Sequence, residues 1–90
     1  MKVQKQFVLR KIGGEYVIIP TRRTDPTVNR LIILNEIQAD LWRMLQGGAD
    51  FDDLLSGIME IYDVSASSAR DDIQEFLGIL EGAGMLDKSE

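Results

Sequence analysis

The chain has 90 residues, of which 44% are apolar and 28% charged, and its formal charge is −5. This composition is typical of one globular domain, here expected to span residues 1–90, and not of a disordered segment. Because the chain contains no cysteine and no histidine, disulfides, thiolate metal sites, thiol nucleophiles and histidine bases are excluded. We therefore expect a binding protein that is not an enzyme and holds neither metal nor cofactor.

The first third of the chain predicts strands. Residues 7–12 and 15–19 are rich in β-branched and aromatic side chains, and Gly13 and Gly14 separate them. A Gly-Gly pair suits the positive φ angles of a two-residue hairpin turn. The register that this turn predicts pairs Leu9 with Ile18, Arg10 with Val17, and Lys11 with Tyr16. A third strand is expected over residues 28–34, after a polar loop.

The remainder of the chain predicts three helices. Their expected N-caps are Asn35, with Gln38 completing a capping box, Asp50 and Ser65. Glycines at 47 and 48 end the first helix, and a glycine at 82 or 84 ends the third. The apolar side chains that recur at helical spacing, and are expected to face the core, are Ile37, Leu41, Met44, Leu45, Phe51, Leu54, Leu55, Ile58, Ile61, Tyr62, Ala69, Ile73, Phe76, Leu77 and Leu80. The predicted fold class is α+β, with three strands followed by three helices.

The third predicted strand indicates a binding surface. Leu31, Ile32, Ile33 and Leu34 make it apolar on both faces, because successive side chains of a strand alternate sides. A three-stranded sheet has two edge strands with unpaired backbone groups, and this strand is free to be one of them. Such an edge is either covered by the first helix or binds another strand. Both alternatives stay open at the level of sequence.

The third predicted helix carries more apolar side chains than its core contact needs. Phe76 and Ile79 widen its apolar stripe on one side, next to Asp72 and Glu75. This strip either lines a groove for a peptide or makes a broader contact with the first helix.

Five stretches of the sequence carry a family resemblance: FVLRKIGGEYVIIP (7–20), LIILNE (31–36), DLWRMLQGG (40–48), IYDVS (61–65) and FLGILEGAGML (76–86). In order and spacing they resemble the PqqD family, whose members are recognition elements for ribosomally synthesised, post-translationally modified peptides. The resemblance covers nearly the whole chain. It implies a winged helix-turn-helix, with a three-stranded antiparallel sheet followed by three helices.

The function that the resemblance implies is that of a non-catalytic adaptor. The leader segment of a precursor peptide adds as a strand to the third strand and rests in the cleft beside the third helix. The adaptor then presents it to a modifying enzyme, often a radical S-adenosylmethionine enzyme. The namesake of the family serves pyrroloquinoline quinone biosynthesis, but LIILNE and DLW are more similar to the broader family. The pathway is therefore left open.

The resemblance also implies the residues that contact the peptide. They are Arg30, Leu31, Ile32, Ile33, Leu34, Asp72, Glu75, Phe76 and Ile79. The carboxylates of Asp72 and Glu75 favour a leader with a basic residue at the matching position.

Two alternatives compete with peptide binding. A winged helix often binds DNA, but here residues 36–90 hold thirteen acidic and three basic residues, against two acidic and seven basic in residues 1–35. The acidic helices would repel DNA phosphates, so we expect no nucleic-acid partner. The other alternative is a homodimer that pairs through the same edge strand.

The sequence predicts a cytoplasmic protein with no membrane partner. Residues 1–6 lack the apolar segment of a secretory signal. The longest aliphatic run, residues 31–34, is far shorter than the roughly 20 residues of a membrane helix.

Overall fold

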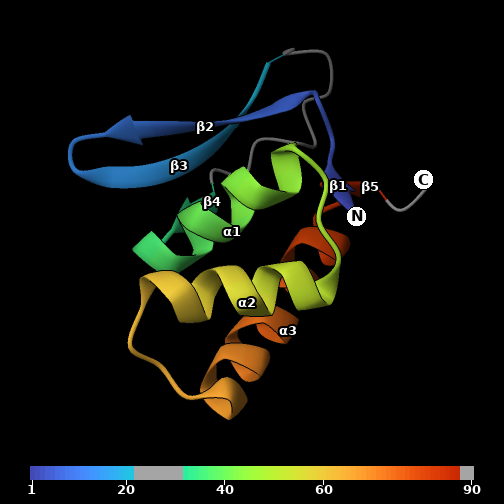
Figure 1. Ribbon diagram of the computed structural model, residues 1–90. Coiled ribbons are helices and arrows are strands. Elements are labelled where there is room, and N and C mark those ends of the chain that lie inside the picture. Colours follow the sequence, from blue (N-terminus) through green and yellow to red (C-terminus); the bar gives the residue numbers. More distant parts are fainter. Residues whose placement is uncertain (22–31, 88–90) are drawn as a thin grey trace.

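A computed structural model describes residues 1–21 and 32–87 (Figure 1). Its elements in chain order are β1 (Lys2–Val3), β2 (Phe7–Ile12), β3 (Glu15–Pro20), β4 (Ile32–Leu34), α1 (Glu36–Gln46), α2 (Phe51–Ile61), α3 (Ala66–Gly82) and β5 (Leu86–Asp87). The larger sheet is antiparallel with the strand order β2-β3-β4, and three helices follow it. The predicted α+β architecture is confirmed. The predicted third strand is described only from Ile32, because residues 28–31 lie outside the described ranges.

A small second sheet was not predicted. β1 pairs with β5, so that Val3 lies opposite Leu86 and the two ends of the described chain lie side by side (Figure 1). Each strand has only two residues, and such a short pair gives no alternating pattern by which sequence periodicity could detect it.

The β2–β3 hairpin has the predicted turn and register. Gly13 and Gly14 have φ angles of 58° and 83°, as a type I′ turn requires. All three predicted cross-strand pairs are present. β3 runs one residue further than predicted, because Pro20 takes part in the pairing opposite Phe7.

The three helices begin at the predicted caps. The Asn35 side chain accepts a hydrogen bond from the Gln38 backbone N–H, and the Gln38 side chain accepts one from the Asn35 N–H. Asp50 and Asp53 form the same reciprocal pair at α2, and Ser65 caps α3. None of the described helices is long and apolar enough to cross a membrane.

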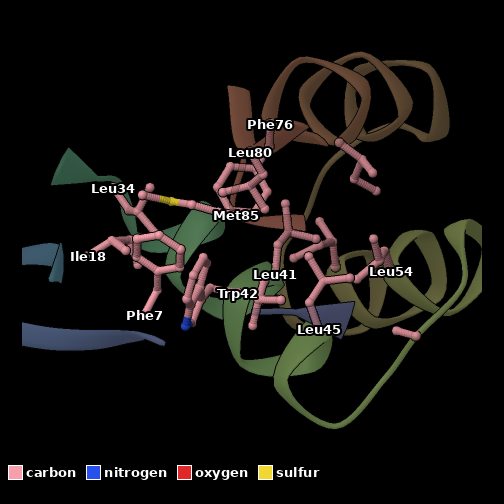
Figure 2. Packing of buried hydrophobic residues seen from close by; sticks show 14 of the residues in the cluster. Phe7, Ile18, Leu34, Leu41, Trp42, Leu45, Leu54, Phe76, Leu80 and Met85 are labelled. Atoms are coloured by element: carbon pink, nitrogen blue, oxygen red, sulfur yellow. The ribbon is translucent and has the colours of Figure 1, made fainter. Parts of the chain in front are cut away.

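The core lies between the sheet and the helices (Figure 2), and most of its predicted members are buried. Ile61 is a correction: it is the last residue of α2 and is 59% exposed. Trp42 is fully buried but was absent from the predicted stripe. Its indole N–H has no hydrogen-bond partner within residues 1–21 and 32–87, and an unpaired buried donor costs about 1–3 kcal/mol. Burial of a ring with roughly 200 Å² of surface, worth about 5 kcal/mol, outweighs that cost.

Asp40 of α1 links three elements of the fold. The Tyr62 hydroxyl, just after α2, donates a hydrogen bond to its carboxylate. Arg43 donates another at 2.9 Å, and the Arg43 guanidinium lies 5.3 Å from the centre of the Tyr16 ring in β3. Contacts of this kind hold α1 against both α2 and the hairpin.

This link predicts a loss of stability in strong alkali. The hydrogen bond to Asp40 and partial burial raise the pKa of Tyr62 to about 12, from an ordinary value of 10.0. The stabilisation is therefore complete below pH 10 and is lost as the pH rises through 12. We expect Tyr62→Phe to lower the free energy of unfolding at pH 8 by about 1 kcal/mol. The difference between wild type and variant, measured by urea denaturation, should vanish towards pH 12; a difference that stays constant over this range would contradict the link.

Candidate functional site

β4 is an edge strand of the larger sheet. It pairs with β3 on one side, and no other described strand pairs with its outer side. An edge strand presents N–H and C=O groups to whatever lies beside it. Which groups face outward follows from the alternation of the pairing across the sheet.

That alternation begins at the hairpin turn. A two-residue turn is closed by a pair that exchanges backbone hydrogen bonds, here Ile12 and Glu15, and such pairs recur at every second position. The Thr21 N–H donates to the Gln6 carbonyl at 2.7 Å, which continues the same series beyond the strand end. Residues 15, 17, 19 and 21 therefore direct their backbone groups toward β2. Pro20 has no N–H, and its pairing with β2 needs none, because residue 20 lies between the residues that bond to β2.

The backbone groups of Tyr16 and Ile18 must then face β4. They lie opposite Leu34 and Ile32, so these two residues of β4 bond to β3. Ile33, between them, directs its own N–H and C=O to the open edge.

The open edge ends at Asn35. The Asn35 N–H donates to the Gln38 side chain at 3.0 Å, and its carbonyl accepts from the Ala39 N–H at 2.9 Å. Among the described residues of this edge, Ile33 alone therefore offers a free backbone pair. Two of the predicted strand-site residues, Arg30 and Leu31, lie outside the described ranges.

The side chains of β4 differ sharply in exposure. Leu34 is 4% exposed and belongs to the core, Ile32 is half-buried against it, and Ile33 is 60% exposed. The apolar strand predicted from sequence is thus covered on one face only in its described part. The two alternatives for the edge itself, cover by the first helix or addition of another strand, stay predictions.

A groove lies where β4 passes into α1. A cavity of about 150 Å³ separates the first turns of α1 from α3, and its lining residues are Asn35, Ile37, Gln38, Leu41, Asp72 and Glu75. The two predicted acidic residues therefore lie together beside the end of the edge strand. Neither forms an ion pair with another described residue.

Phe76 and Ile79 have different environments. Phe76 is fully buried and packs in the core with Leu80 and Met85 (Figure 2), so here it has no surface for a peptide. This corrects its predicted place in the groove wall. Ile79 is 41% exposed and, at helical spacing, lies on the same face of α3 as Asp72 and Glu75.

The first turn of α1 was missing from the predicted site. Asn35, Ile37 and Gln38 line the groove, whereas the sequence reveals them only as capping and core residues. Their positions directly after the predicted edge strand are the sequence feature that could have placed them in the site.

Comparison with known proteins gives one family and two structures. The family model described as "Coenzyme PQQ synthesis protein D (PqqD)" matches residues 15–86. A solved structure described as "TbiB1 in Complex with the TbiA(beta) Leader Peptide" is similar at a TM-score of 0.77 and 20% identity, over 100% of this chain and 99% of that one. "Lasso peptide synthetase B1 complexed with the leader peptide" is similar at 0.73 and 19%, over 93% of each chain. No curated protein matches in sequence.

The pairing direction in β4 predicts opposite outcomes for two neighbouring proline substitutions. Ile32→Pro removes an N–H that faces β3 and leaves the Ile18 carbonyl without its partner, which should cost about 2–3 kcal/mol. Ile33→Pro removes an N–H that faces the open edge, a position where strands tolerate proline. Urea denaturation of both variants should rank Ile32→Pro clearly as the less stable. Equal destabilisation would show that the assigned direction is wrong.

Proposed function

Because this chain belongs to the PqqD family, we propose that it is a non-catalytic adaptor for a ribosomally synthesised precursor peptide. It binds the leader segment of the precursor and presents it to the enzyme that modifies it. The observation that carries this proposal is the open edge of β4, where the free backbone pair of Ile33 lies beside the groove between α1 and α3.

Strand addition is the binding mode that this site supports. The leader pairs with β4 through backbone hydrogen bonds, and alternate side chains point to opposite faces of the extended sheet. Those on the inner face reach the groove with Asp72 and Glu75, and the exposed Ile79 extends its wall. Both similar structures are described as complexes with leader peptides, which supports the same use of this fold.

The chemistry belongs to the partner enzyme. Neither Asp52 and Asp53 nor Asp71 and Asp72 can act as an acid–base pair, because neighbours on a helix do not face each other. A radical S-adenosylmethionine enzyme in the cytoplasm is the proposed partner, and pyrroloquinoline quinone synthesis is one pathway that fits the family.

Selection of peptides from a displayed library of short randomised sequences tests peptide binding directly. We expect the selection to enrich peptides that bind the wild-type protein. Their affinity for Ile33→Pro should be at least about tenfold lower, because proline lacks the backbone N–H that faces the open edge. Titration calorimetry measures both affinities. Equal affinity of the folded variant would contradict strand addition.

Two substitutions in α3 separate the groove wall from the core. Ile79→Asp should weaken binding of the selected peptide about tenfold while the domain stays folded, because the side chain is already exposed. Phe76→Ala removes a fully buried ring and should cost about 3–5 kcal/mol of folding stability. Circular dichroism melts of both variants provide the control, and unfolding by Ile79→Asp would place Ile79 in the core instead.

The acidic residues of the groove predict a charge preference. Selected peptides should carry a basic residue on one inward-facing position, and Glu75→Gln should weaken their binding about two- to fivefold at low salt. The effect should shrink in high salt, where exposed charges are screened. Glu60→Gln, on the exposed side of α2, is a matched control that should leave affinity unchanged. Equal affinities of Glu75→Gln and wild type for the selected peptides would contradict the predicted preference for a basic residue.

A further inference from the structure

Ile33 has an exposed side chain on the outer face of the sheet. Arg10, Val17 and Ile33 lie opposite one another across β2, β3 and β4, so their side chains share one face. The neighbouring row, with Ile18 and Ile32, packs on the core. The Arg10–Val17–Ile33 row is therefore on the other face of the sheet from Ile18 and Ile32. Val17 in the middle of the row is buried, and the row ends at the open edge with Ile33, which is 60% exposed.

A hollow borders Ile33 at the edge of the sheet, and residues of both the Ile33 row and the neighbouring Lys11–Tyr16–Leu34 row line it. It has a volume of about 590 Å³ and lies where the hairpin turn, β4 and the start of α1 meet, with Gly14, Tyr16, Ile33 and Glu36 among its lining residues. Ile33 thus combines a free backbone pair with an exposed side chain, and it borders this hollow.

Strand addition at this edge determines where the side chains of the peptide go. The peptide residue that bonds to the backbone of Ile33 lies directly opposite it, and opposite residues place their side chains on the same face. This holds for a peptide that runs antiparallel to β4, the arrangement assumed below; in a parallel pair, Ile33 would bond instead to the two residues that flank the opposite one. The paired residue therefore points to the outer face, beside Ile33, and its two neighbours point inward.

We propose that Ile33 is a specificity-determining residue, which selects a β-branched or aromatic side chain at the paired position of the leader peptide. This inference rests on the proposed function and adds a contact on the face opposite the groove. An apolar side chain there covers Ile33 and extends the row from Val17, whereas a polar or small one leaves Ile33 in water. The leader is thus recognised on both faces of the sheet that it joins.

The test uses a peptide enriched from the displayed library of short randomised sequences. Single N-methylations along that peptide identify the residue whose backbone bonds to Ile33, because only edge-facing N–H groups are needed for binding. That residue should be β-branched or aromatic among the enriched peptides. Its replacement by alanine should weaken binding about five- to tenfold, as measured by titration calorimetry.

A matched pair of protein variants isolates the side-chain contact. Ile33→Thr keeps a β-branched residue and the backbone pair but removes apolar surface, and it should weaken binding about five- to tenfold. Ile12→Thr is the control, since Ile12 is also on the outer face and 56% exposed but lies at the hairpin turn on β2. The alanine-substituted peptide should bind Ile33→Thr with nearly the same affinity as the unsubstituted peptide does, because the two changes remove the same contact.

The failures of the two proposals are distinguishable. The inference is overturned if the enriched peptides show no preference at the paired position and bind Ile33→Thr as tightly as wild type. The adaptor function still stands in that case, provided that Ile33→Pro weakens binding of these peptides. If no peptide is enriched, the adaptor function itself fails. A dimer detected by sedimentation, which Ile33→Pro converts to monomer, assigns the edge to a second copy of the chain and overturns both.

Discussion

The alternation of backbone hydrogen bonds across β2, β3 and β4 is the constraint on which the site depends. It starts at the Gly13-Gly14 turn, because two residues with positive φ can close the hairpin only on a bonded pair. Every second residue of β3 then forms its backbone hydrogen bonds with β2, and the residues between them bond with β4. The direction of the Ile33 backbone groups follows, although Ile33 lies far from the turn in sequence.

Asn35 limits the same edge from the other side. Its capping box begins α1 and occupies the backbone N–H that would otherwise continue the free edge. The chain therefore turns into the helix directly after Leu34, and the first turn of α1 comes to face Asp72 and Glu75 across the groove. One local motif thus ends the strand, starts the helix and positions the groove.

The division of apolar side chains between core and surface determines what the site can offer. Phe76 and Ile79 are three residues apart on one helix, yet the first is fully buried and the second is 41% exposed. Ile33 and Leu34 show the same contrast on β4. The core takes the larger share, as a small domain requires, and Ile33 and Ile79 stay exposed, as the proposed peptide site requires.

Sequence alone determined the hairpin and the three helices of this protein, together with the turns and caps that bound them. The register of the hairpin and the caps at Asn35, Asp50 and Ser65 depend on turn chemistry and on contacts between near neighbours, so a local pattern is sufficient. The family, and with it the expected fold, also followed from the sequence. Only the tertiary structure decided that β4 lies next to β3 at an edge, that Phe76 and Trp42 are in the core, and that Ile61 and Ile33 are not. Helical and strand periodicity give the direction of a side chain, whereas its burial depends on which distant element packs against that direction.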